Sequence, residues 1–170
     1  MKEYDLNKLL SSDIIVEDKI NEFIAKRILK KQAVDFEEVK GHILKAEHNL
    51  RFVLENISIG FLDWAITGCY YACYHAALSL ILTKGYSSKN HDATLCALIK
   101  EFYKKGLNKE DIEILSSFID YHDLLFYLES KNKREDATYS TRFGFDKTEV
   151  EQLRIKAAMF VSKIKSILNK

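Results

Sequence analysis

The 170-residue sequence contains no proline and only six glycines, so it lacks most of the residues that break or turn a chain. This scarcity favours long uninterrupted helices over a turn-rich β-fold. A dominant charge is lacking as well, because 26 Lys and Arg balance 25 Asp and Glu. A net charge of +1 creates no overall field that would attract nucleic acid or an anionic membrane, so any such binding must be local.

Cysteine is also scarce, and Cys69, Cys73 and Cys96 include no C-x-x-C pair. The sequence opens without the regions of a secretory signal, so we expect reduced thiols and a cytoplasmic location. Cys69 and Cys73 are four residues apart and could bind a metal, but thiolate sites usually need four ligands, and both lie in an apolar run. We expect them to fill the core, and we expect neither a metal nor a cofactor.

Motifs of enzymes built on helical bundles are missing. No Glu has a His three residues later, which excludes the di-metal site of ferritin-like bundles. The HExxH zinc motif, the Gly-rich phosphate loops and the Gly-x-Ser-x-Gly elbow are absent too. These absences remove most enzyme classes and leave it uncertain whether the protein is an enzyme at all.

Apolar residues do recur at helical spacing along most of the chain. We predict an all-α fold, an antiparallel helical bundle of four long helices plus a shorter one over residues 35–170, with an N-terminal helical extension over residues 1–34. No segment indicates a strand. The first long helix is expected to start at Asp35, and the second to span about 61–84, before Gly85. A shorter helix should start at Ser87 or Ser88 and end by Gly106. The last two should span about 109–130 and start at Thr148.

The run from Trp64 to Leu82 has 19 residues without Asp, Glu, Lys or Arg and is long enough to span a membrane. It also contains polar side chains, and the other helices are amphipathic and need a surface to cover. We therefore expect it to be the buried centre of the bundle rather than a membrane span.

Four hydrogen-bonding side chains follow one another at four-residue spacing on this central helix: Thr67, Tyr71, His75 and Ser79. Residues four apart lie on one helical face, so they form a polar row. The row either bonds to neighbouring helices and fixes their register, or forms the floor of a cleft or a seam between two copies. On the helix before it, His42 falls off the apolar stripe and is expected to be solvated.

Three further features have two interpretations each. His122 has the spacing of an inward-facing residue, so it is either a core histidine or a ligand or base. Residues 131–147 lose the helical period, and Arg134, Asp136 and Tyr139 there either offer a cation and a ring to a base or phosphate or form an ordinary polar loop. The cations between Lys26 and Lys31 are interpreted as a solvated helix end in preference to an RNA-binding patch.

Several runs resemble the HEPN family of helical bundles, especially its small stand-alone branch. Asp63-Trp64-Ala65 followed by Cys-Tyr-Tyr-Ala-Cys-Tyr-His-Ala-Ala over residues 69–77 is similar to the Ala…Tyr-Tyr-Ala-x-x-His-Ala-Ala signature of the second core helix. Lys45-Ala-Glu-His-Asn-Leu50, Gly85 with Ser88-Lys-x-His91, and Arg134-x-x-Ala-x-Tyr139 keep the family order. The resemblance covers residues 35–168.

This resemblance implies a homodimer, often encoded beside a minimal nucleotidyltransferase in a toxin–antitoxin module. Active members are metal-independent ribonucleases that use an Arg, four to six intervening residues, and a His. Arg134 matches the Arg, but Tyr139 stands where the His most often falls, and no His follows Arg134. An ordinary tyrosine titrates near pH 10 and serves acid–base cleavage poorly.

We therefore expect a dimerising module that binds a nucleotide, an RNA or a minimal nucleotidyltransferase, as a toxin–antitoxin or defence component without the Arg-to-His motif. The expected binding residues are Arg134, Asp136, Tyr139, Tyr71 and His75. The alternative is a metal-independent RNase toxin whose histidine comes from elsewhere in the fold, with His75, His122 and Arg134 as catalytic candidates and His91 as another source. A third possibility is a structural protein whose polar row only sets the register of a dimer.

Overall fold

The computed structural model describes residues 5–134 and 145–169, and over residues 126–134 it describes the helix but not the side chains. The fold is all-α with one very small sheet, which confirms the predicted class. Its elements are α1 (Leu6–Ser11), α2 (Asp13–Ala25), β1 (Leu29–Lys31), α3 (Phe36–Ser58), α4 (Leu62–Leu82), β2 (Tyr86–Ser88), α5 (His91–Phe102), α6 (Lys109–Arg134) and α7 (Lys147–Leu168).

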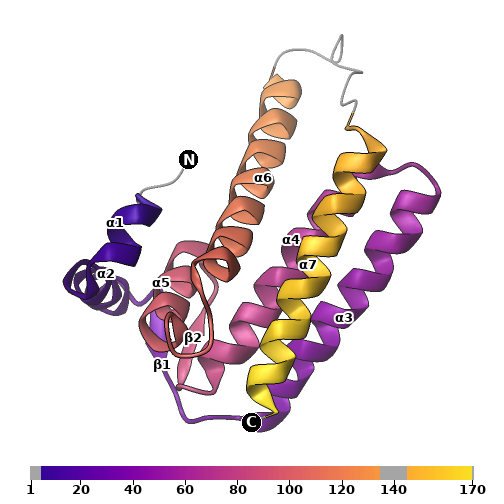
Figure 1. Cartoon of the computed structure of the whole chain (residues 1–170). Coiled ribbons are helices and arrows are strands. Elements are labelled where there is room, and N and C mark those ends of the chain that lie inside the picture. Colours follow the sequence, from indigo (N-terminus) through magenta and orange to yellow (C-terminus); the bar gives the residue numbers. More distant parts are fainter. Residues whose placement is uncertain (1–4, 135–144, 170) are drawn as a thin grey trace.

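Helix α4 is the centre of the bundle. Helices α3, α6 and α7 run alongside it, α5 packs near its C-terminal end, and α2 packs on α5 (Figure 1). By length and composition α4 could cross a membrane, but 78% of its most apolar stretch is buried inside the protein. The prediction of an apolar helix enclosed by its amphipathic neighbours is therefore confirmed in its packing.

Small residues on α4 let the neighbouring helices approach closely. Ala65, Cys69 and Cys73 are completely buried, and a Cβ atom added to Gly68 would lie 2.7 Å from Val53 Cγ2 on α3. The three cysteines are free and buried, which confirms their place in the core. Burial raises the pKa of the Cys69 thiol to about 12, so this thiol is neutral and unreactive at physiological pH.

The prediction that no segment forms a strand is wrong. β1 and β2 pair antiparallel, with Lys30 opposite Ser87, and the Gln32 N–H extends the ladder by donating to the Gly85 carbonyl at 2.9 Å. Strands of three residues are too short to show the alternation by which a strand is predicted. This pairing ties the segment after α2 to the segment after α4.

Two helices start at residues other than those predicted. The side chain of Asn90, rather than Ser87 or Ser88, caps α5 by accepting from the Ala93 N–H, because both serines belong to β2. Asp146, rather than Thr148, caps α7. The actual cap of α5 comes two residues after Ser88, and that of α7 comes two residues before Thr148. Asn and Asp are strong capping residues, and the helical pattern alone does not locate a helix end to within two residues.

Candidate functional site

The predicted polar row on α4 does not act as one unit. Ser79 is completely buried and donates to the Ala76 carbonyl at 2.6 Å, while Thr67 donates to the Asp63 carbonyl at 3.1 Å. Both hydroxyls thus bond to their own helix, and the expectation that they bond to neighbouring helices is wrong. Tyr71, at 41% exposure, and the half-buried His75 remain at the surface.

Tyr71 and His75 belong to a larger group of rings, which we call the tyrosine–histidine cluster: Tyr70, Tyr71, Tyr74 and His75 of α4, His42 of α3 and His122 of α6. Tyr70 stacks on His122 with ring centres 4.1 Å apart, and Tyr71 meets the same imidazole edge-on at 5.9 Å. Such pairs each contribute roughly 0.5–1.5 kcal/mol beyond their burial. Three helices therefore hold the rings of this cluster in place.

His42 and His75 form a hydrogen bond between their Nδ1 atoms, which lie 2.8 Å apart. One ring must donate and the other accept, so the bond requires at least one neutral imidazole. Burial lowers the pKa of His75 to about 4, helped by His42 and Lys45. Burial also lowers the pKa of His42, against the opposing charge of Glu38. Both rings are therefore neutral at pH 7 and able to accept a proton.

The solvation expected for His42 is wrong, because α3 lies so close to α4 that a side chain beside its apolar stripe reaches the neighbouring helix. No signal in the sequence of α3 identifies this contact, since spacing within one helix does not reveal its register against another. The same reason hides the contributions of Tyr70 and Tyr74.

A second set of titratable groups adjoins the cluster. The carboxylate of Asp123 lies 3.8 Å from His122 Nδ1 and 3.9 Å from His91 Nε2, and Asp92 Oδ1 lies 3.8 Å from the same His91 nitrogen. The interpretation of His122 as a plain core residue is too simple, because its ring is stacked on one side and faces a carboxylate.

The predicted loop residues lie apart from this cluster along the chain. Arg134 is the last residue of α6, so the helix continues further than the expected end near residue 130. It follows His122 by twelve residues, which corresponds to about 18 Å along a helix. The backbone positions of His122 and Arg134 are therefore more than three helical turns apart. Asp136 and Tyr139 lie outside the described residues.

A cavity of about 270 Å³ opens beside the cluster, and we call it the ring pocket. Its lining comes from three elements, Glu38 and His42 of α3, Tyr74, Leu78 and Leu82 of α4, and Ser87, Ser88 and Lys89 at the end of β2. The Tyr74 hydroxyl oxygen is buried. Burial raises the pKa of Tyr74, and the neighbouring Thr94 side chain acts against this rise.

Comparisons with known proteins agree with this architecture. The model of the HEPN domain matches residues 39–167. Two Methanocaldococcus jannaschii proteins, each named a "putative toxin", are similar to the chain: one is 30% identical over 77% of this chain and 82% of its own length, the other 33% identical over 78% and 90%. The UPF0332 protein of Archaeoglobus fulgidus is 28% identical over 79% of this chain and 98% of its own length. Because the HEPN domain model matches nearly the whole α3–α7 bundle, with its Tyr-Tyr-Ala-Cys-Tyr-His central helix, this chain belongs to the HEPN domain family.

Proposed function

We propose that this chain is a toxin-like HEPN module that pairs with a second copy of itself and binds single-stranded RNA across the tyrosine–histidine cluster. The names of two relatives support the toxin-like part of the proposal. The observation that carries the binding part is the exposed edge of the cluster, where rings stand at the surface of a rigid bundle.

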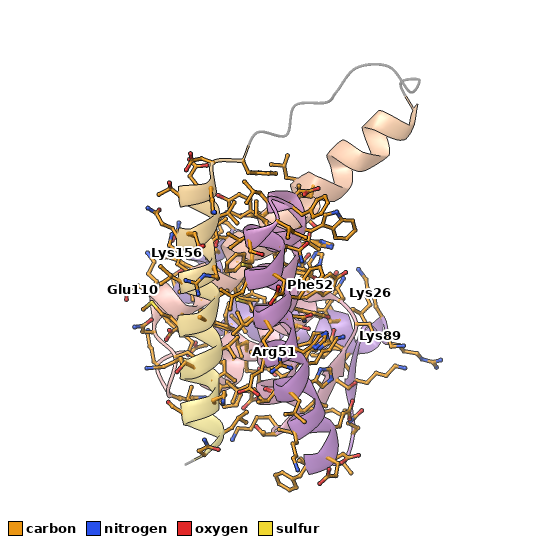
Figure 2. The ribbon with its side chains drawn as sticks, turned by 90° about the vertical axis from the view of Figure 1, so that its right-hand side faces the viewer. Lys26, Arg51, Phe52, Lys89, Glu110 and Lys156 are labelled. Atoms are coloured by element: carbon orange, nitrogen blue, oxygen red, sulfur yellow. The ribbon has the colours of Figure 1, made fainter. Side chains whose placement is uncertain are left out.

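Exposed rings are the groups on which unpaired bases stack. Tyr71 is 41% exposed, and Phe52 of α3, shown in Figure 2, is equally exposed. Phe52 lies beside Gly68 of α4, which precedes Tyr71 by less than one helical turn. Each base stacked on such a ring contributes about 1–3 kcal/mol and needs no particular sequence. The near-zero net charge of the chain makes ring stacking a larger share of the binding than long-range attraction.

The test is the substitution Tyr71→Ala, with affinity for a fluorescent single-stranded RNA measured by anisotropy. Loss of one stacked base predicts roughly tenfold weaker binding. Met159→Ala is the matched control, because Met159 is an exposed apolar side chain on α7 that belongs to no part of the cluster. Equal affinities of the wild-type protein and the Tyr71 variant would refute RNA binding at this surface.

Arg134, at the end of α6, is the residue that we propose as a phosphate contact for an RNA strand that extends beyond the cluster. We expect Arg134→Ala to weaken RNA binding and to reduce its dependence on salt, because one phosphate contact is lost. If the binding partner is instead a minimal nucleotidyltransferase, the same substitution would leave RNA binding unchanged and weaken co-purification of the two proteins. An unchanged affinity for both would remove Arg134 from the site.

A ribonuclease is the second candidate, and the His42–His75 hydrogen bond is the observation that favours it. A neutral His75 could accept the proton of a ribose 2′-hydroxyl, with a cation at the phosphate. Because the pKa of His75 is about 4, such cleavage would stay constant from pH 8 to about 5.5 and fall only near pH 4. Purified protein that leaves RNA intact, or a His75→Ala variant that cuts it as fast as wild type, would exclude this candidate.

A further inference from the structure

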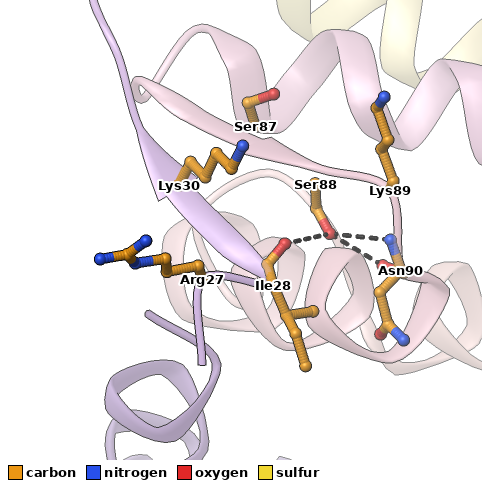
Figure 3. Close-up of a pocket in the computed structure, with 7 residues that line it drawn as sticks. All are labelled: Arg27, Ile28, Lys30, Ser87, Ser88, Lys89 and Asn90. Carbon is orange, nitrogen blue, oxygen red and sulfur yellow. Dashed lines mark hydrogen bonds between the residues drawn. The ribbon is translucent and has the colours of Figure 1, made fainter. Parts of the chain in front are cut away.

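A second cavity, of about 360 Å³, lies next to the ring pocket, and we call it the basic pocket. It is lined by Arg27, Ile28 and Lys30 from the segment after α2, and by Ser87, Ser88, Lys89 and Asn90 from β2 and the turn before α5. Figure 3 shows Lys30 and Ser87 on the facing strands, Lys89 beyond Ser88, and Arg27 at the outer rim. Ser88 fixes the floor, since its hydroxyl donates to the Asn90 carbonyl at 3.0 Å.

The three cations of the basic pocket form no ion pair within the described part of the chain, unlike several cations around them. Lys26 pairs with Glu22 at 2.6 Å, and Lys31 stands over the Tyr86 ring with its ammonium 3.3 Å from the ring centre. Among the residues that the structure describes, no acidic side chain lines the basic pocket. Positive charge without a protein counter-ion, beside serine hydroxyls, is the lining that suits a phosphate group.

The two cavities are neighbours, because Ser87, Ser88 and Lys89 line both. Their charge differs, since the ring pocket contributes the carboxylate of Glu38 and the buried hydroxyl of Tyr74. Glu38 would repel a phosphate and accept a hydrogen bond from an amine or a hydroxyl. A molecule that fills both cavities therefore carries its phosphate at the Lys30 end and a polar, ring-bearing part at the Tyr74 end.

We infer that the basic pocket binds the terminal phosphomonoester of an RNA strand, whose first nucleoside extends into the ring pocket. A terminal phosphate carries up to two negative charges, whereas a phosphodiester inside a strand carries one, so three cations favour the end of the strand. The inference rests on the proposed RNA binding and deepens it. The pocket is not a feature of the family-matched region alone, because Arg27 and Lys30 precede the match to residues 39–167.

The experiment compares two short single-stranded RNAs of one sequence, one with a 5′-phosphate and one with a 5′-hydroxyl, by anisotropy with the full chain. We expect the phosphorylated strand to bind about tenfold more tightly, as for one added charge-assisted contact. A strand phosphorylated only at its 3′ end identifies which end is bound. If wild-type protein binds the 5′-phosphorylated, the 3′-phosphorylated and the unphosphorylated strands with equal affinity, the inference is overturned.

Two substitutions test the pocket itself. Arg27 has a φ of 57°, a left-handed conformation that glycine adopts without cost, so Arg27→Gly removes the guanidinium without threatening the fold. Lys89→Gln removes the cation shared by the two cavities. We expect each to reduce the preference for the phosphorylated strand several-fold. Lys156→Gln is the matched control, since Lys156 lies on the other side of the molecule from Lys89 (Figure 2).

The outcomes separate this inference from the proposed function. Tyr71→Ala should weaken the binding of both RNAs alike and so keep the ratio of the affinity for the phosphorylated strand to the affinity for the unphosphorylated strand. The pocket variants should lower this ratio. A ratio unchanged in both pocket variants, or lowered equally in Lys156→Gln, overturns the assignment. If adenosine monophosphate displaces the phosphorylated strand at matching concentrations, the pocket is a phosphomonoester site. The same result would overturn the inference that the bound phosphate belongs to an RNA strand. Inorganic phosphate, titrated alone by calorimetry, tests the pocket even if no RNA binds.

Discussion

At the scale of single residues, the His42–His75 hydrogen bond depends on the protonation state of both rings. Two imidazoles that share one hydrogen bond through their Nδ1 atoms cannot both carry a proton there. Lys45 adds positive charge beside His75, and Glu38 adds negative charge beside His42. The pair is therefore held neutral by burial and by its own geometry, and acidification works against it.

The first prediction concerns pH. His75 has a folded pKa of about 4 and an ordinary value of 6.5, so between these values the unfolded chain binds more protons than the folded one. The free energy of unfolding should therefore fall as the pH drops from 6.5 to 4.5, by about 1 kcal/mol after allowance for solvent screening of this half-exposed group. Urea denaturation at a series of pH values measures it.

His75→Gln is the comparison for this pH dependence, because glutamine can hydrogen-bond to His42 but does not titrate. We expect a flatter profile for the variant over the same range. Identical slopes for the two proteins would mean that His75 keeps an ordinary pKa in the folded state.

The second prediction concerns two glycines in neighbouring helices. A Cβ atom at Gly68 would lie 2.7 Å from Val53 Cγ2 and 3.0 Å from Phe52 Cδ1, whereas one at Gly41 meets nothing within 4 Å. Overpacking should make Gly68→Ala destabilising by about 1–3 kcal/mol, more than the gain in helix propensity. Gly41→Ala should instead stabilise by up to about 1 kcal/mol. Chemical denaturation of both variants decides, and equal effects would contradict the close approach of α3 and α4.

At the scale of elements, the β1–β2 ladder is a very small unit of structure that joins the segment after α2 to the segment after α4. Gly85 has a φ of 70°, and a Cβ atom there would lie 2.7 Å from the Gln32 carbonyl oxygen. The turn thus needs glycine for two reasons, its left-handed backbone and the close passage of the opposite strand.

The third prediction follows from this turn. Gly85→Ala should cost more stability than Gly60→Ala, because Gly60 also has a positive φ, of 85°, but has open space around it. The left-handed strain alone costs about 1–2 kcal/mol, and only the Gly85 variant adds the clash with backbone. Amide hydrogen exchange should accelerate at Gln32 in that variant alone. Protection of Gln32 that is equal in both variants would show that the ladder tolerates a side chain at this position.

The sequence predicted the long elements well and the short ones poorly. The helical period located α3, α4, α6 and α7, because a stripe repeated over several turns is a strong signal. Two strands of three residues carry no comparable signal, and their serines were predicted to cap a helix. For the candidate site, the sequence identified Tyr71 and His75 but not His42, whose role depends on how two helices are placed against each other. Asp136 and Tyr139 stay predictions.

At the scale of the whole molecule, large apolar side chains gather at the turn between α3 and α4. Ile59, Phe61 and Trp64 are each more than half exposed there. Neighbouring exposed apolar residues often mark a contact surface. The homodimer that we propose would cover this turn and bring the tyrosine–histidine clusters of two copies onto one assembly.

The fourth prediction tests that pairing. Wild-type protein at micromolar concentration should sediment as two chains, and Trp64→Glu should sediment as one, because a charge replaces the ring at the proposed interface. Met159→Glu places the same charge on an exposed position of α7 and should leave the dimer intact. A wild-type mass near one chain would remove the pairing from the proposal.

The short ladder between β1 and β2 also divides the wall of the basic pocket between two parts of the chain. Because Lys30 faces Ser87 across the ladder, residues before the shared HEPN region build one wall of a cavity whose other wall lies inside that region. Substitutions at Arg27 and Lys30 would therefore change the charge of this cavity without altering any residue of the shared bundle. Larger changes in the same segment would reach the core, because Ile20, Phe23 and Leu29 are buried there.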